Sequence, residues 1–329
     1  MSRRSGGSRS LRTLVALIAV AAAAVPLLAS SRALSSQANA TALSDAHAAR
    51  VTFSPRSSLA RLDLRSGNVR RLPVRGFFAA ARPSLAPSGR LAFVATTCAS
   101  CEQHLAVVGG ARATRVGPAV SVAWLNDERL LTSAGPGEDT DVWLVGPSGR
   151  RQEVEWLSDA AEHIDVESKR ALTVSPNRRL LAFSGEGPRE HHGNYVADLV
   201  EHRLLPLPGE GDDAPAFAPD GRTLAYQHVS SRGDWDLCFS RVARGTVSQR
   251  HCLPSPGNDR EPAFVNGRVL VFASDRMAPR SGVSSLYLLD LRTDALRRLT
   301  PPGYDATSPT VGSDGHGVIF VRRSLLPVR

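Results

Sequence analysis

The chain has 329 residues, a length that accommodates one large domain or two ordinary ones. Its hydrophobic content of 42% is that of a globular protein. Five arginines precede Thr41 with no acidic residue among them, and removing these five from the formal charge of +9 leaves +4 for the rest. The remaining arginines are scattered among acidic residues and form no stripe, which argues against nucleic-acid binding.

The N-terminal segment has the features of an export signal. Four arginines lie among the first twelve residues, an apolar run follows from Leu14 to Ala29, and small residues offer cleavage sites near Ala33 and Ala40. We therefore expect a signal peptide over residues 1–40 and an exported protein, periplasmic or extracellular. The alternative is an uncleaved inner-membrane anchor, because residues 13–31 carry no charge and approach the length that spans a bilayer.

After a linker over residues 41–50, one sequence unit recurs along the chain. Each copy is an apolar run, a turn with residues such as Asp-Gly or Asn-Gly, and a second apolar run, which is typical of a β-hairpin. The copies are 84–93, 122–132, 172–183, 215–226, 262–272 and 309–320. Their last residues, the closing positions, are 93, 132, 183, 226, 272 and 320, with a mean spacing of about 45 residues. That spacing predicts four-stranded propeller blades.

A second kind of hairpin lies between these copies, for example over 140–157 and 235–253. The segment SSLARLDLRSGNVRRL at 57–72 resembles SSLYLLDLRTDALRRL at 284–299. We therefore expect the N-terminal hairpin to be the outer half of a blade whose inner half lies at 308–321. The sequence predicts an all-β fold, a six-bladed β-propeller over residues 51–329 closed by its two ends, with no sustained helical periodicity after residue 50.

Three segments resemble the propeller repeat of the TolB family: PAFAPDGR at 215–222, ASDR at 273–276 and SLYLLD at 285–290. The resemblance covers 57–73 and 83–323. It implies a periplasmic, non-enzymatic propeller that binds the peptidoglycan-associated lipoprotein at one mouth. TolB carries an α/β domain ahead of its propeller, and only about ten residues lie between Thr41 and Val51, so a stand-alone TolB-like propeller is expected.

Four cysteines in an exported chain indicate disulfides. Cys98 and Cys101 share a short loop, and Cys238 and Cys252 flank a predicted hairpin, so these two pairings are favoured over the alternatives. A zinc site at Cys98, Cys101 and His104 lacks a second ligand pair. Neither a metal nor another cofactor is expected.

The candidate binding site is the channel mouth on the face that carries the linkers between blades. Gly-x-Asp recurs there at 211–213, 257–259 and 303–305, each shortly before a proline. Acidic side chains around a channel mouth are suited to hold a cationic group, although aspartates also cap turns. For Arg276, the alternative to contact with a ligand is an ion pair with an acidic residue of its blade. The same alternative applies to Arg232. The predicted site residues are Asp165, Asp212, Asp213, Asp259, Arg260, Arg276, Tyr304 and Asp305.

These features favour a non-catalytic, monomeric binding propeller that recognises a protein or a cell-envelope component. The sequence contains no G-x-S-x-G nucleophile motif, and the adjacent His191 and His192 have no evident third metal ligand. The alternative is a hydrolase or lyase that acts on a carbohydrate or peptide through carboxylates at the channel mouth. A membrane is expected as a partner only if the N-terminal segment remains as an anchor.

Overall fold

The computed structural model describes residues 52–99, 101, 104–109, 113–135, 139–187, 191–243, 245–279 and 281–326. The predicted signal segment and linker lie outside the described residues. Within the described ranges, no helix is both long and apolar enough to cross a membrane.

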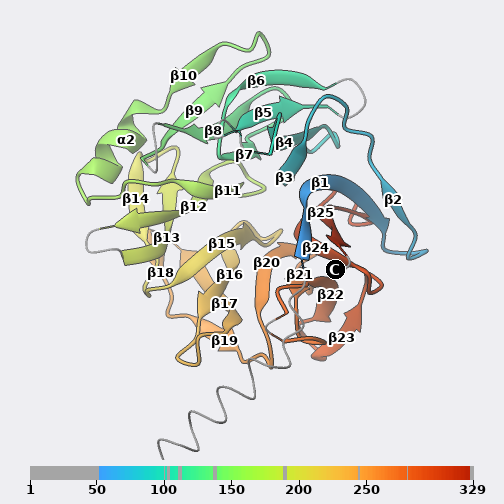
Figure 1. Ribbon diagram of the computed structural model, residues 1–329. Coiled ribbons are helices and arrows are strands. Elements are labelled where there is room, and N and C mark those ends of the chain that lie inside the picture. Colours follow the sequence, from blue (N-terminus) through green and yellow to red (C-terminus); the bar gives the residue numbers. More distant parts are fainter. Residues whose placement is uncertain are drawn as a thin grey trace, which may run out of the picture. The chain divides into compact units, whose positions relative to one another are not determined.

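The strands form six antiparallel sheets, the blades, and Figure 1 shows their first strands around a common centre. Blade 1 contains β3 (Ala79–Leu85), β4 (Leu91–Thr96), β5 (Leu105–Val108) and β6 (Thr114–Pro118). Blade 2 contains β7 (Ser121–Trp124), β8 (Leu130–Ala134), β9 (Asp141–Val145) and β10 (Arg151–Glu153). Blade 3 contains β11 (Arg170–Val174), β12 (Leu180–Gly187), β13 (His191–Asp198) and β14 (Arg203–Pro206).

The other three blades follow the same meander. Blade 4 contains β15 (Asp212–Phe217), β16 (Thr223–Val229), β17 (Trp235–Ala243), β18 (Thr246–Val247) and β19 (His251–Leu253). Blade 5 contains β20 (Asp259–Phe264), β21 (Val269–Ser274), β22 (Ser285–Asp290) and β23 (Ala295–Arg298). Blade 6 contains β24 (Tyr304–Val311), β25 (Gly317–Leu326), β1 (Thr52–Asp63) and β2 (Val69–Arg71). The predicted all-β, six-bladed propeller is confirmed.

Blade 6 is built from both ends of the described chain, in the strand order β2–β1–β25–β24. Its register places Ala60 opposite Phe320 and Leu62 opposite Val318. Such pairing leaves no unpaired strand edge at the junction between the first and last parts of the chain.

The hydrophobic core lies between neighbouring blades. Six buried clusters each join two adjacent blades, because alternate side chains of a strand point to opposite faces of its sheet. The closing positions contribute the largest fully buried side chains of the described residues, each 0% exposed: Phe93, Phe183, Tyr226, Phe272 and Phe320. Burial of an aromatic ring between sheets stabilises the stacking of one blade on the next.

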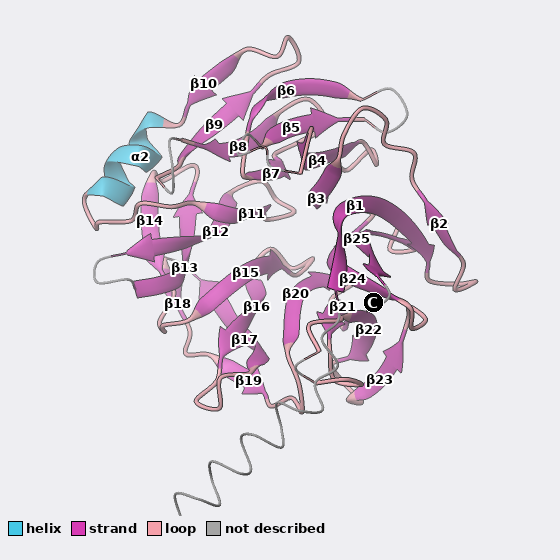
Figure 2. Ribbon diagram, in the orientation of Figure 1, coloured by secondary structure: helices cyan, strands magenta, loops and turns pink. Residues whose placement is uncertain are grey.

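One short helix lies after residue 50, where the sequence shows no sustained helical periodicity. Helix α2 (Glu155–Glu162), drawn in cyan in Figure 2, leaves blade 2 and precedes blade 3. Its buried residues Leu157 and Ala161 extend the cluster between these two blades. The helix has only eight residues, too few to give a sustained 3.6-residue period in the sequence.

Both expected disulfides are present, Cys98–Cys101 in the connection between β4 and β5, and Cys238–Cys252. Cys238 and Cys252 are directly opposite each other in the pairing of β17 with β19. The second disulfide therefore links β19, an outer strand of blade 4, to the neighbouring strand β17.

Candidate site in the central channel

Five of the six first strands carry a β-bulge. In each, the ladder register shifts and a residue other than glycine has a positive φ: Arg82 (46°), Ala171 (49°), Ala214 (50°), Glu261 (52°) and Ser308 (49°). Such a backbone costs roughly 1–3 kcal/mol at each position, so the surrounding structure must hold it.

Hydrogen bonds from the preceding blade hold the bulges. Ser184 Oγ accepts the N–H of Ala214 at 3.0 Å, and Gln227 Oε1 accepts the N–H of Glu261 at 3.0 Å. Glu261 Oε2 in turn accepts the N–H of Ser308 at 2.6 Å. The bulges therefore connect consecutive blades and turn their own side chains toward the channel, as bulges next to functional sites commonly do.

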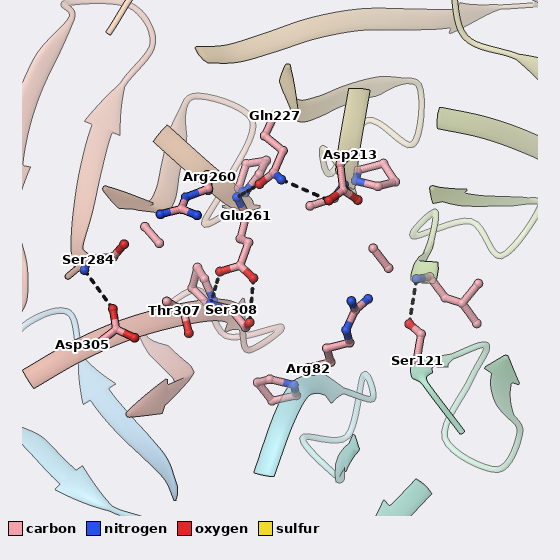
Figure 3. A pocket seen from close by; sticks show the side chains of 18 of the residues that line it. Arg82, Ser121, Asp213, Gln227, Arg260, Glu261, Ser284, Asp305, Thr307 and Ser308 are labelled. Carbon is pink, nitrogen blue, oxygen red and sulfur yellow. Dashed lines mark hydrogen bonds between the residues drawn. The ribbon is translucent and has the colours of Figure 1, made fainter. Parts of the chain in front are cut away.

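The bulge residues line a cavity of about 330 Å³ in the centre of the propeller, here called the channel cavity. Figure 3 shows the side chains around it. Its charged residues are Arg82, Asp213, Arg260, Glu261, Asp305 and Arg323, and its polar residues include Ser121, Gln227, Ser284, Thr307 and Ser308. Three arginines and three acids thus line one cavity.

The three carboxylates of the channel cavity are all hydrogen-bonded by the protein. Asp213 accepts the amide of Gln227 at 3.1 Å and the N–H of Ala214 at 2.6 Å. Glu261 accepts both the N–H and the hydroxyl of Ser308. Asp305 accepts two guanidinium N–H groups of Arg323, at 2.8 and 3.2 Å, and the N–H of Ser284.

A second cavity of about 390 Å³, the outer pocket, lies at the ends of strands in blades 3 and 4. It shares Arg82 and Asp213 with the channel cavity, so the two spaces adjoin. Its wall adds apolar surface from Trp235 and Val229. Glu186 also lies there, between Arg170 and His192, each at 3.5 Å.

The structure buries three of the predicted aspartates in ion pairs, and one of them, Asp305, is 1% exposed and pairs with Arg323 as described above. Asp212 is 1% exposed and lies 2.8 Å from His228 Nδ1 and 3.2 Å from Arg250. Asp259 is 4% exposed and bonds Ser274 and Arg276. Burial raises the pKa of Asp212 and of Asp259 above the ordinary value, against the opposing effect of their cationic partners. Asp212 borders the outer pocket, while Asp259 lines neither cavity.

Among the described residues, the other predicted positions divide between the channel and elsewhere. Asp213, Arg260 and Asp305 line the channel cavity. Tyr304 is 7% exposed, with its ring stacked on Phe320 and Arg322 over its face. Asp165 is exposed after α2 and borders neither cavity.

The ion-pair alternative for two arginines is confirmed. Arg276 pairs with Asp259 and lies over the rings of Phe272 and Tyr287. Arg232 lies 3.4 Å from Asp236. These arginines therefore contact their own blade.

The bulges change which residues correspond between blades. Counted from the bulge, Asp212 matches Asp259, and Asp213 matches Arg260, whereas Gly-x-Asp spacing had aligned Asp213 with Asp259. The sequence reasoning missed Arg82 and Glu261. A usable signal was the proline that follows each bulge in blades 1, 4, 5 and 6, because proline inside a sheet is confined to edges, strand starts and bulges.

In the part of the chain that the structure describes, no three His, Cys, Asp or Glu side chains are grouped so that they could hold a metal ion.

Neither a known family profile nor a curated protein matches this sequence. Solved structures do match. A candidate TolB from Agrobacterium tumefaciens aligns at 17% identity with a TM-score of 0.62, covering 84% of this chain and 100% of its own. TolB from Acinetobacter baumannii aligns at 13% identity with a TM-score of 0.52, covering 91% and 71%. The fold is the TolB-type propeller.

A gluconolactonase from Xanthomonas campestris also has this architecture, at 14% identity with a TM-score of 0.55, covering 81% of this chain and 90% of its own. TolB structures and a gluconolactonase thus share this propeller architecture, and function follows from the site and not from the fold.

Proposed function

We propose that this chain is an exported, non-catalytic binding propeller that recognises a protein or cell-envelope partner at the channel mouth. The observation that carries this proposal is the continuity of the two cavities. The outer pocket offers Trp235 and Val229 to a partner, and the adjoining channel cavity offers charged groups, with Arg82 and Asp213 at the junction. Tryptophan and arginine around a desolvated pocket are the residue types that dominate binding energy at protein interfaces.

The wider setting of the proposal is an exported monomer. It would consist of a signal peptide or anchor over 1–40, a linker over 41–50 and a propeller over 51–329. The two disulfides support an oxidising compartment, periplasmic or extracellular. The TolB-like fold supports a protein as the partner.

An experiment on the outer pocket tests the binding function. The purified protein is immobilised and incubated with an envelope extract of the source organism, and captured proteins are identified by mass spectrometry. We expect a specific partner that Trp235→Ala loses. Val200→Ala is the matched control, because Val200 is a 67% exposed apolar side chain in the turn between β13 and β14. Equal capture by wild type and Trp235→Ala, with both variants folded, contradicts the proposal.

The second candidate is a hydrolase or lyase, favoured by the presence of Asp213 and Glu261 in one cavity and by the fold shared with a gluconolactonase. Against it, both carboxylates are held by hydrogen bonds from Gln227 and Ser308. Turnover of a lactone, glycoside or peptide that Asp213→Asn and Glu261→Gln both abolish would establish this enzyme and displace the binding function.

A further inference from the structure

Two guanidinium groups in the channel cavity have no protein partner among the described residues. Arg82 is exposed on the bulge of β3, and Arg260 is half-buried on β20. Figure 3 shows the two side chains on opposite sides of the cavity, with Glu261 between them, and no dashed line reaches either arginine. Arg323, in the same wall, contrasts with them because Asp305 accepts two of its N–H groups. A guanidinium presents five N–H donors, so Arg82 and Arg260 supply a large unused donor capacity.

A buried hydroxyl adds to this capacity. Ser284 is 1% exposed and lines the channel cavity, and its Oγ has no hydrogen-bond partner among the residues that the structure describes. Its backbone N–H is already donated to Asp305. A buried hydroxyl without a partner is unusual in a folded protein, and a ligand oxygen in the cavity would satisfy it.

The balance of charge in the wall limits the ligand. The channel cavity has three arginines and three carboxylates, so its total formal charge is near zero. A phosphate carries a charge of about −1.5 to −2 and would lie close to Asp213 and Glu261. A carboxylate carries one negative charge and matches the fork of a guanidinium with two parallel hydrogen bonds. The wall therefore favours a single carboxylate over a phosphate.

We propose that the channel cavity is a carboxylate subsite in which Arg82 and Arg260 bind carboxylates from opposite sides of the cavity, and Ser284 Oγ, on the side of Arg260, donates to the anion bound there (Figure 3). This inference rests on the proposed binding function and names the chemistry of the ligand group that enters the channel. The cavity volume of about 330 Å³ holds a small acid or the acidic end of a longer chain that continues into the outer pocket. This reverses the sequence-based expectation of a cationic ligand group, because the acids there already have protein partners.

The test uses N-acetylglycine as the probe and N-acetylglycinamide, which lacks only the carboxylate, as its matched control. Binding is followed on the whole exported protein by the NMR signals of the arginine Nε–H groups, which report weak binding directly. We expect N-acetylglycine to shift two arginine signals and the amide to shift none. The double variant Arg82→Gln/Arg260→Gln should weaken binding by about tenfold or more, since two charge-assisted contacts are lost.

The control variant is Arg297→Gln, because Arg297 is an exposed arginine on the outer strand β23. It should bind N-acetylglycine as the wild type does. Equal affinity in wild type and the double variant overturns the proposal, as does the absence of any shift up to about 50 mM probe, where a millimolar site would be filled. Tighter binding of inorganic phosphate than of N-acetylglycine overturns the choice of a carboxylate.

Competition separates this inference from the proposed function. Release of a captured envelope partner by N-acetylglycine identifies an acidic end of that partner as the ligand. A partner that Trp235→Ala loses but the double arginine variant retains contradicts the carboxylate subsite and leaves the binding function in place. Carboxylate binding without any captured partner contradicts the macromolecular function and supports a small acid as the ligand.

Discussion

Blades 2 and 5 occupy equivalent places in the ring but are built differently. Blade 5 has Phe272 at its closing position, a bulge at Glu261 and the buried pair of Asp259 with Arg276. Blade 2 has Thr132 at its closing position, and the hydroxyl of this 1% exposed residue has no partner. Its first strand β7 runs in regular register with β8, without a bulge.

The difference shows that a propeller blade need not carry every feature of its repeat. Blade 2 has one contact that the described residues of blade 5 do not match: helix α2 packs Leu157 and Ala161 against it. Both blades have an arginine over an aromatic ring, with Arg151 over Trp143 at 4.8 Å in blade 2. Each blade is stabilised by its neighbours as much as by its own residues, so an irregular blade is tolerated when something else covers its faces.

The largest expected difference between the two blades is in the free energy of unfolding that is lost when the side chain at the closing position is truncated. Phe272→Ala should lower the free energy of unfolding by about 3–5 kcal/mol, because it opens a cavity between blades 4 and 5. Thr132→Ala should cost less than about 1 kcal/mol, since its hydroxyl makes no bond. Urea-induced unfolding at intact disulfides measures both. Equal losses would mean that the two blades are stabilised in the same way.

The next test concerns the buried ion pair of blade 5. Asp259→Ala leaves Arg276, whose side chain is 17% exposed, without its carboxylate and should cost about 3 kcal/mol of unfolding free energy. Asp305→Ala should cost less, because Arg323 is 39% exposed and can turn to water. Thermal unfolding of both variants beside Asp259→Asn checks the order, and a smaller loss in Asp259→Ala than in Asp305→Ala contradicts it.

The blade count and the closing positions were predictable because hairpins repeat locally in sequence. The aromatic residues at 93, 183, 226, 272 and 320 recur at a fixed phase, and all are buried. The disulfides followed from two cysteines in one short loop, Cys98 and Cys101, and two on paired strands, Cys238 and Cys252.

The candidate site was less predictable because it depends on contacts between blades. Whether Asp213 faces the channel and Asp259 faces Arg276 depends on the bulge register, which shifts correspondence by one residue. Asp212 pairs with His228 and Arg250, which lie 16 and 38 residues away in the sequence. No regular sequence spacing predicts these two partners.

A smaller change in the free energy of unfolding, a gain and not a loss, is expected from a substitution in blade 2. Thr132→Val removes a buried hydroxyl that has no partner and keeps the shape of the side chain. The free energy of unfolding should rise by about 1 kcal/mol, as burial of an unsatisfied polar group is relieved. The matched change in blade 5 is Ser274→Ala, which removes a hydroxyl that donates to Asp259 and should destabilise. Destabilisation by Thr132→Val in urea unfolding would indicate that Thr132 has a bound partner, such as water.

The smallest expected effect is on the pH dependence of stability, which should differ between the outer turns of the two blades. In blade 5, Arg268 donates to Asp290, as do the N–H groups of Arg292 and Thr293, and these bonds hold the pKa of Asp290 well below its ordinary value of 3.8. The folded state therefore binds this proton less readily than the unfolded state. Stability from Asp290 is complete above the ordinary pKa and is lost as the pH falls below it.

The melting temperatures of wild type and Asp290→Asn should therefore differ most near neutral pH, with the wild type higher, and converge as the pH falls below about 4. The corresponding turn of blade 2 has Ser148 and no acid, so Ser148→Ala should leave the pH dependence unchanged. A constant difference between wild type and Asp290→Asn across pH would show that Asp290 acts through hydrogen bonds that do not depend on its charge. The contrast between the blades would then lie in their cores and not in the ionisation of their turns.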